Sequence, residues 1–271
     1  MNNTPLISLI IPCYNAEFSL EKCLKSVIEQ DYPTLEIIII DDGSTDKFTL
    51  DLLETLKFDN KIKLISTINQ GVCKARNQGF MESAGLFLLA LDSDDLISPQ
   101  FIELSVNQLL EDDSVKLVAT NYNFFGRINR TVKLEEYSIE KLMGHNLFVV
   151  STMFRRKDFD SVGGFNSNMK EGLEDWDFWL SIMKNGGDVK YIEGVNFFYR
   201  IKPKIKSRNI SSAVKNHEIL RRRLWQNHKE LYSLNYPNPL EMQEYLNVVN
   251  SREYWLGKII LFPLRKFLNL F

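Results

Sequence analysis

Short apolar runs alternate with helical patterns through the first 120 residues, and this alternation restricts the fold more than any other feature. The apolar runs are rich in isoleucine, leucine and valine and lie at residues 6–11, 35–40, 61–65, 86–91 and 115–119. Residues 17–30 and 101–110 instead carry apolar side chains at the three- and four-residue spacing of a helix. Near-continuous apolar strands are typical of a largely parallel sheet that is buried on both faces. The alternation therefore predicts an α/β fold with right-handed crossovers.

The chain beyond residue 120 has a less regular pattern. Gly163–Gly164 indicates a turn, and residues 174–184 carry large apolar side chains at helical spacing before Gly186–Gly187. A basic loop at 202–208 follows, and helical patterns then continue to the end. We expect an α/β domain over residues 1–205 and a basic, helical C-terminal extension over residues 206–271.

The charge of the chain is unevenly distributed. The formal net charge is −2, but residues 1–199 carry −11 and residues 200–271 carry +9. Such a split suggests cation chemistry in the first part and an anionic partner for the second. No recognised nucleic-acid-binding motif accompanies the basic residues, so we expect no nucleic-acid partner.

The remaining composition points to a cytoplasmic protein. No apolar run reaches the length that spans a bilayer, and the N-terminus lacks the layout of a signal peptide. The three cysteines show no CxxC spacing, which favours reduced thiols, and the three histidines are too scattered for a zinc site.

Three of the predicted strands run directly into distinctive polar sequences. These sequences are Pro12-Cys13-Tyr14-Asn15, the acidic segment Asp41–Asp46, and Asp92-Ser93-Asp94-Asp95. Open α/β sheets bind ligands beyond the carboxyl ends of their strands. Tyr14 could stack on a base, and Asp42 could accept a hydrogen bond from a base or a ribose. Three carboxylates within Asp92–Asp95 repel one another and favour a hard cation such as Mg²⁺ or Mn²⁺. Each acidic cluster taken alone also fits a solvated turn or a helix cap.

Six ordered motifs resemble those of the family 2 glycosyltransferases. They are SLIIPCYNAE at 8–17, DDGSTD at 41–46, NQGVCKARNQG at 69–79, LDSDD at 91–95, GGF at 163–165 and EDWDFWL at 174–180. The resemblance spans about residues 5–200 and implies a GT-A fold, in which a mostly parallel, Rossmann-like sheet is flanked by helices. It also implies that residues 1–205 form a catalytic domain that transfers a sugar from a nucleotide donor with inversion at the anomeric carbon.

The resemblance assigns roles to the strand-end residues. Pro12, Tyr14 and Asn15 would line the nucleotide site, and Asp42 would hold the base. Arg76 would lie by the nucleotide or its phosphates, although a structural salt bridge to Asp92 is the alternative. Asp92 and Asp94 would form the DxD pair, with Asp94 as the metal ligand and Asp95 beside them in either role.

The same resemblance places the general base in the Glu174-Asp175 segment. Inverting transfer needs a carboxylate that takes the proton of the acceptor hydroxyl, and we assign this role to Asp175. Asp177 is the structural alternative, because a carboxylate in a first helical turn also interacts favourably with the helix dipole. Glu174 would contact the acceptor or orient the base. Trp176 is either a platform for the acceptor sugar or a core residue packed with Trp179.

Two basic segments lie at or beyond the limit of the resemblance. Phe198-Tyr199-Arg200 resembles a YR segment of the family, and Lys202, Lys204, Lys206 and Arg208 follow it. They form either a basic loop over the donor phosphates or a solvated loop, and the histidine that the family often has here is missing. Residues 257–271 combine apolar side chains with Lys258, Arg265 and Lys266. This segment suits an anionic membrane surface, or a helix docked on the domain or on another subunit of a homo-oligomer.

Together these features predict a metal-dependent glycosyltransferase. We expect a nucleotide-sugar donor, UDP-sugars favoured, a saccharide or lipid-linked saccharide acceptor, and a role in lipopolysaccharide, capsule or other surface-glycan synthesis. The expected location is cytoplasmic, with peripheral binding to the inner face of the membrane as an option. One alternative is a sugar-nucleotide-forming nucleotidyltransferase, which would normally carry a glycine-rich phosphate loop after the first strand. Another is a non-catalytic nucleotide-binding scaffold.

Overall fold

The computed structural model describes residues 4–59, 61–202, 216–234, 248 and 251–267. The chain divides into two compact units between Leu220 and Arg221. The expected boundary at residues 205–206 falls in the stretch 203–215, which lies outside the described residues.

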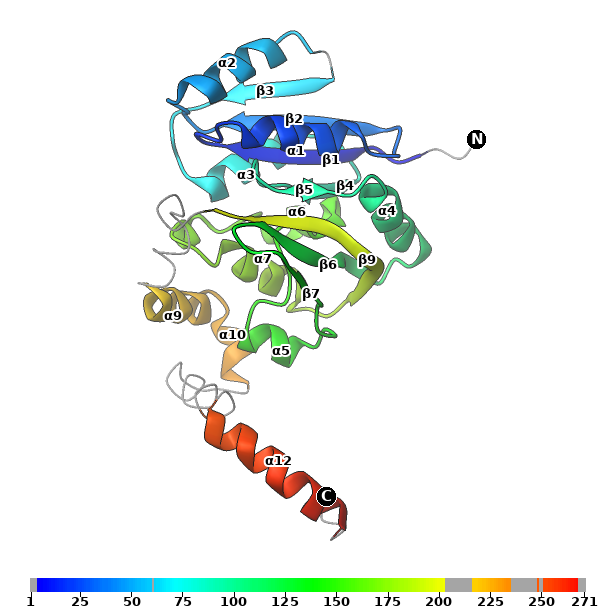
Figure 1. The fold of residues 1–271 in the computed structure, drawn as a ribbon, viewed down its shortest axis with the longest axis vertical. Helices are drawn as coiled ribbons and strands as arrows, with labels where there is room; N and C mark the ends of the chain where they lie inside the picture. The colour runs from blue at the N-terminus through cyan, green and yellow to red at the C-terminus, as the bar shows by residue number, and fades with distance from the viewer. Residues whose placement is uncertain (1–3, 60, 203–215, 235–247, 249–250, 268–271) are drawn as a thin grey trace. The chain divides into compact units, whose positions relative to one another are not determined.

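The first part of the larger unit alternates strands and helices as the sequence predicts (Figure 1). Its elements are β1 (Ile7–Cys13), α1 (Ser19–Ile28), β2 (Leu35–Asp41), α2 (Lys47–Leu56), β3 (Ile62–Ser66), α3 (Val72–Met81) and β4 (Phe87–Ala90). The helices α2 and α3 were not expected from the apolar pattern. Helix α2 begins after Asp46, whose side chain accepts a hydrogen bond from Thr49 N and so caps the helix.

The second part of this unit is less regular, again as its sequence indicates. Its elements are β5 (Leu96–Ile97), α4 (Phe101–Glu111), β6 (Val115–Gly126), β7 (Arg130–Val132), α5 (Ile139–Gly144), β8 (Met153–Arg155), α6 (Arg156–Val162), the 3-10 helix η1 (Ser167–Met169), α7 (Glu174–Met183) and β9 (Asp188–Ile201). Further along the chain, α9 (His217–Asn227), α10 (Lys229–Ser233) and α12 (Arg252–Phe267) supply the helical character expected of the C-terminal extension.

The strands of the described residues form one sheet in the order β3-β2-β1-β4-β8-β6-β9-β5, with β7 paired to β6. Strands β3, β2, β1 and β4 are mutually parallel. Beyond them β8 runs antiparallel to both β4 and β6, β6 and β9 are parallel, and β5 runs antiparallel to β9. The expected α/β class is confirmed. The parallel strands make up one half of the sheet, and its other half is mixed.

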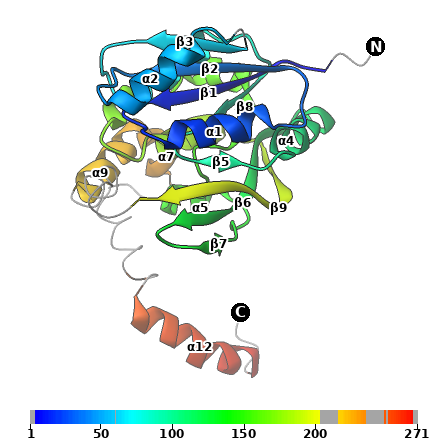
Figure 2. The ribbon, with the colours of Figure 1, turned by 45° about the horizontal axis from the view of Figure 1, so that its top comes forward.

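Helices cover both faces of the parallel half. On one face Leu9 and Ile11 of β1 belong to a buried cluster with Leu20 and Leu24 of α1, and Figure 2 shows α1 and α2 on the same side of β1 and β2. On the other face, α3 approaches so closely that a Cβ built on Gly79 would meet the Ile10 side chain. With both faces covered, ligand access is left to the strand ends.

An aromatic cluster fixes helix α7 in the mixed half. The ring of Phe178 stacks on Phe165 with a centroid separation of 4.2 Å and meets Phe154 edge-on at 5.2 Å. Trp179 also packs on Phe154. Because these rings are buried, they hold the first turn of α7 in a fixed position relative to the sheet.

The smaller unit contains most of the C-terminal helices. Trp255, Leu256, Ile259 and Ile260 of α12 are all exposed. Among the described residues, no helix has the length and apolar character needed to cross a bilayer.

Candidate active site

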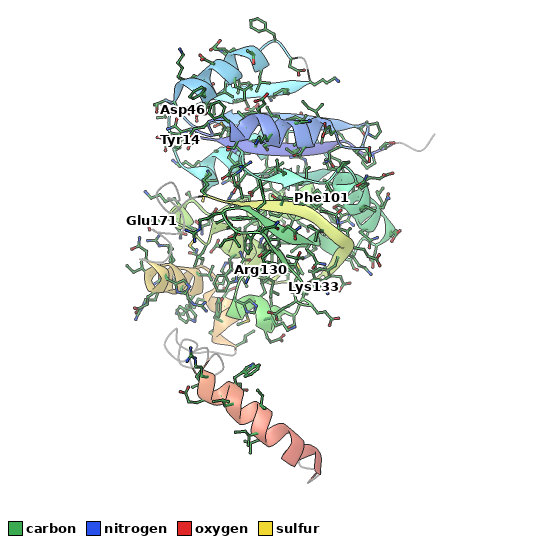
Figure 3. All side chains as sticks on the ribbon, viewed as in Figure 1. Tyr14, Asp46, Phe101, Arg130, Lys133 and Glu171 are labelled. Atoms are coloured by element: carbon green, nitrogen blue, oxygen red, sulfur yellow. The ribbon has the colours of Figure 1, made fainter. Side chains whose placement is uncertain are left out.

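The loops after β1 and β2 are joined by one asparagine side chain. Asn15 Oδ1 accepts hydrogen bonds from Thr45 N at 2.7 Å and Asp46 N at 3.0 Å. Asn15 also adopts a left-handed conformation, with φ of 51°, which Asn tolerates better than most residues. Pro12 is buried in β1, whereas Tyr14 is 40% exposed and lies near Asp46 at the strand ends (Figure 3). The side chain of Asn15 therefore shapes this edge, and Tyr14 exposes an aromatic ring there, as Phe18 and Phe48 do in the segments that follow.

The carboxylate of Asp42 accepts hydrogen bonds from other groups of the protein. Its Oδ1 accepts from Gln70 N and its Oδ2 from Gly71 N, both at 2.8 Å. Thr67 Oγ1 also donates to Oδ1, at 3.3 Å. The family resemblance assigns Asp42 to the nucleotide base, and in this structure its carboxylate holds the loop that leads into α3. It acts on the carboxyl end of the parallel strands from a buried position.

Arg76 of α3 joins two distant parts of the chain. Its Nη2 contacts Asp92 Oδ1 at 2.7 Å, and its Nη1 contacts Glu174 Oε1 at 2.9 Å. Burial disfavours the charge of Arg76, but Asp92 and Glu174 outweigh burial and raise the pKa of the guanidinium. At 2% exposure the side chain is not placed to meet a phosphate. The salt bridge to Asp92 considered as the alternative is the arrangement observed.

The other two aspartates of the acidic segment contact the end of β9. Lys202 Nζ lies 2.7 Å from Asp94 Oδ2, and Arg200 N donates to Asp95 Oδ1 at 2.8 Å. Asp94 is partly exposed, whereas Asp95 is buried. Burial, followed by the charges of Asp94 and Asp92, raises the pKa of Asp95 well above its ordinary value. The YR segment is thus beside the DxD segment, while Lys204, Lys206 and Arg208 lie outside the described residues.

Asp175 sits in the first turn of α7, next to Glu174. Its Oδ2 accepts from Asn146 Nδ2 at 2.9 Å, and its Oδ1 accepts from the backbone N–H of Trp176 at 2.8 Å. Burial, followed by the negative charge of Glu174, raises the pKa of Asp175 to about 7. The residue as a whole is nevertheless only partly buried. A reachable carboxylate with a pKa near neutrality is suited to accept a proton.

Trp176 differs from the expectation of an acceptor platform. The residue is 2% exposed, and its Nε1 donates to the carbonyl oxygen of Leu142. A buried ring presents no face to a sugar, so the core-packing alternative describes Trp176 in this structure. Asp177, the structural alternative to the base, is also buried.

The sequence analysis did not identify Asn146 or the backbone donors at Gln70 and Gly71. Asn146 lies in the irregular stretch between residues 120 and 172, where no periodic pattern indicated a position. The role of the two backbone N–H groups depends on the loop conformation, which residue types alone do not specify.

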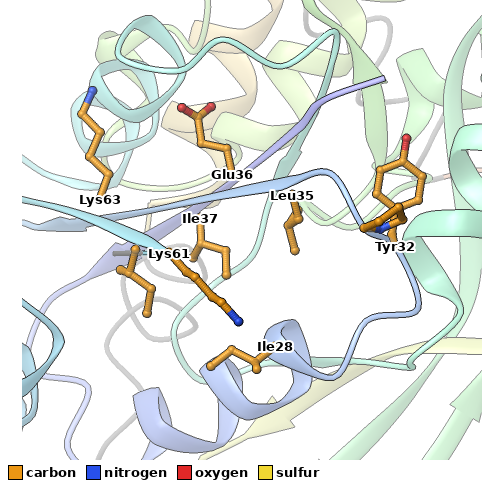
Figure 4. Close-up of a pocket in the computed structure, with 9 residues that line it drawn as sticks. Ile28, Tyr32, Leu35, Glu36, Ile37, Lys61 and Lys63 are labelled. Carbon is orange, nitrogen blue, oxygen red and sulfur yellow. The ribbon is translucent and has the colours of Figure 1, made fainter. Parts of the chain in front are cut away.

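Two further observations concern the metal ligands near the site and the position of a hollow relative to it. Within the part of the chain that the structure describes, no three His, Cys, Asp or Glu side chains are grouped so that they could hold a metal ion. A hollow of about 530 Å³ lies between α1, β2 and β3 and is lined by Ile28, Tyr32, Leu35 and Lys61 among others (Figure 4). It includes the first residues of β2 and β3, whereas the acidic groups lie beyond the opposite strand ends.

The fold and site define an α/β protein whose acidic groups gather at the carboxyl ends of parallel strands, where such sheets bind nucleotides. Residues 8–175 match the family described as Glycosyl transferase family 2. This chain therefore belongs to glycosyltransferase family 2.

Individual relatives agree with that assignment. An uncharacterized glycosyltransferase of Haemophilus influenzae is 33% identical over 219 residues, which cover 78% of this chain and 86% of the relative. A hyaluronan synthase of Pasteurella multocida is 31% identical over 69% of this chain, and a chondroitin synthase of the same species is 28% identical over 95%. These matches span only 19% and 26% of the two synthases.

Solved structures support the fold. Staphylococcus aureus TarS residues 1–349 in complex with UDP-GlcNAc superpose with a TM-score of 0.66, covering 85% of this chain and 76% of that chain. The complex of the same protein with UDP gives 0.63, covering 85% and 73%. The sequence identity is 18% in both cases, so this likeness shows the GT-A architecture alone.

Replacing Asp42 tests its contacts with the loop before α3. We expect Asp42→Ala to lower the free energy of unfolding by about 1–3 kcal/mol, because the N–H groups of Gln70 and Gly71 lose their acceptor. Urea titration measures this change. The control Asp51→Ala removes an exposed carboxylate from α2 and should leave stability nearly unchanged. Equal stability of the two variants would contradict the structural role.

Proposed function

We propose that this family 2 glycosyltransferase moves a sugar from a nucleotide donor to a hydroxyl of a saccharide or glycolipid acceptor, with inversion. The observation that carries the proposal is the Asp175 carboxylate, which has a pKa of about 7 and partial exposure. UDP-sugars are favoured as donors, because the structurally similar TarS was solved with UDP-GlcNAc and with UDP. The hyaluronan and chondroitin synthases among the relatives support a saccharide acceptor.

In the proposed reaction Asp175 accepts the proton of the acceptor hydroxyl. The hydroxyl oxygen attacks the anomeric carbon from the face opposite the nucleotide. The bond between that carbon and the diphosphate oxygen breaks, and the electron pair leaves with the diphosphate. Asn146 Nδ2 and the N–H of Trp176 hold the carboxylate, so its orientation is fixed before the acceptor arrives.

A divalent cation, Mn²⁺ or Mg²⁺, fits beside Asp94. Burial, followed by the charges of Asp94 and Asp92, raises the pKa of Asp95, so added positive charge beside this segment would be favourable. Asp92 and Asp94 are both partly exposed, and such cations commonly combine one carboxylate with waters and substrate phosphates. When bound, the cation would neutralise charge on the departing diphosphate. Asp92 is held by Arg76, and Asp95 by the backbone of Arg200.

The alternatives from the sequence have less support. A nucleotidyltransferase would belong to another family than the one that residues 8–175 match. A non-catalytic scaffold would have no need for a carboxylate whose pKa is raised toward neutrality.

Replacing Asp175 tests the proposed base. We expect Asp175→Asn to lower kcat by about 10²–10⁴-fold and to leave nucleotide binding nearly unchanged, because the amide cannot take the acceptor proton. Glu171→Gln, an exposed change in the loop before α7, is the control. Because the base acts when deprotonated, wild-type kcat should rise as the pH increases through about 7. Unchanged turnover in Asp175→Asn would remove Asp175 as the base.

Replacing Asp94 tests the cation site. We expect Asp94→Ala to weaken Mn²⁺-dependent binding of a UDP-sugar by at least about tenfold, measured calorimetrically with and without the ion. Asp113→Ala removes a carboxylate that is 95% exposed and serves as the control. Equal affinity of wild type and Asp94→Ala in the presence of Mn²⁺ would eliminate the metal role.

We propose that the C-terminal helix attaches the enzyme to an anionic membrane surface, where it would act in lipopolysaccharide, capsule or other surface-glycan synthesis. Trp255, Leu256, Ile259 and Ile260 expose apolar surface on α12. The sequence of this segment also carries Lys258, Arg265 and Lys266. Exposed apolar side chains combined with basic residues are typical of helices that lie in a membrane interface.

Deleting residues 257–271 tests this attachment. We expect the truncated protein to lose binding to vesicles that contain anionic lipid and to keep its activity on a soluble acceptor. Binding of the full chain to neutral vesicles is the control and should be weaker. Unfolding of the truncated protein would instead support a helix docked on protein.

A further inference from the structure

Helix α7 offers two adjacent carboxylates in its first turn, and either could in principle accept a proton. Glu174 and Asp175 are neighbours in sequence, and both are partly exposed. Their ordinary pKa values are similar, so the residue type does not decide which of them is the base. The decision must come from their different surroundings.

Glu174 pairs with the positively charged guanidinium of Arg76, whereas Asp175 accepts hydrogen bonds from neutral groups. Arg76 Nη1 contacts Glu174 Oε1 at 2.9 Å, while the Glu174 side chain is 16% exposed. Asp175 accepts from an amide of Asn146 and from a backbone N–H. A carboxylate paired with a buried guanidinium is a poor proton acceptor, because protonation would break the ion pair. Asp175 loses no ion pair when it takes a proton.

Arg76 is fixed in the orientation that serves Glu174. Its other terminal nitrogen contacts Asp92 at 2.7 Å, and its guanidinium lies 5.3 Å from the ring centroid of Phe165. Both terminal nitrogens of the guanidinium are thus paired with carboxylates, and one of its faces lies against an aromatic ring. Turning toward Asp175 would cost both contacts in a site where Arg76 is almost fully buried.

We propose that Arg76 is a positioning residue that selects Asp175 over Glu174 as the base, by holding Glu174 in an ion pair anchored to Asp92. This inference rests on the proposed function, in which the first turn of α7 supplies the base. It predicts that the two neighbours of Asp175 act in opposite directions. The negative charge of Glu174 raises the pKa of Asp175, and the positive charge of Arg76 lowers it.

Other ionisable groups lie around α7, and none of them differs between wild type and the variants. They include Asp177 of α7 itself, Cys73 of α3, Glu140 and Lys141 of α5, Asp158 of α6 and Tyr199 at the end of β9. Their contribution is common to wild type and variants, so a difference in titration reports the changed residue.

The test is a titration of Asp175 itself. In protein labelled with carbon-13 at the aspartate carboxyl groups, the Asp175 signal is identified by its loss in Asp175→Asn. We expect Glu174→Gln to lower the titration midpoint from about 7 by about one pH unit, and Arg76→Met to raise it by a similar amount. Glu140→Gln removes an exposed carboxylate from α5 and should leave the midpoint unchanged. The pH at half-maximal kcat should move in the same directions.

A midpoint that stays constant or rises in Glu174→Gln would overturn the inference, and so would one that stays constant or falls in Arg76→Met. Should Arg76→Met fail to fold, Glu174→Gln still tests the inference, because the amide oxygen of Gln can accept a hydrogen bond from Arg76 in place of the carboxylate. A different result would overturn the proposed function. Full turnover in Asp175→Asn would remove the base, whereas the titration would still show whether Arg76 and Glu174 control Asp175.

Discussion

The buried guanidinium of Arg76 organises the site. A permanently charged group this far from solvent requires anionic partners, because removing one partner of a buried pair costs about 3–5 kcal/mol. The two partners are Asp92, which follows β4, and Glu174, which opens α7. One side chain therefore ties the carboxyl end of the parallel strands to the helix that carries Asp175. The relative position of the two acidic segments depends on this contact.

The end of β9, in the mixed half of the sheet, contacts the acidic segment of the site. Strand β9 runs parallel to β6 and antiparallel to β5, so its last residues meet the acidic segment that begins beyond β4. Arg200 donates to Asp95 from its backbone and to the carbonyl of Asp94 from its side chain, and Lys202 pairs with Asp94. The end of β9 thus places positive charge beside carboxylates that are more than 100 residues earlier in the chain.

The strands could be predicted from the sequence because their apolar runs are local signals, as Ile37–Ile40 in β2 illustrates. Helix α3 could not, because Phe80 is the one large apolar residue of its buried face, which otherwise consists of Cys73, Ala75, Arg76 and Gly79. Its close approach to β1 depends on the missing side chain of a glycine, which a search for hydrophobic periodicity treats as a break. The same contrast between local sequence signals and tertiary packing applies to the site. The motif order identified the acidic segments, whereas the contacts of the Asp42 carboxylate and the burial of Trp176 follow from tertiary packing.

Charge balance explains why donor and cation should arrive together in the proposed mechanism. Asp92 and Asp94 each have one basic partner, and Asp95 has a backbone N–H. The three carboxylates still repel one another, since the charges of Asp94 and Asp92 add to burial in raising the pKa of Asp95. A nucleoside diphosphate would add further negative charge to the same edge of the sheet, and repulsion would oppose its binding alone. A divalent cation held by Asp94 would reduce that repulsion, so each ligand should increase the affinity for the other.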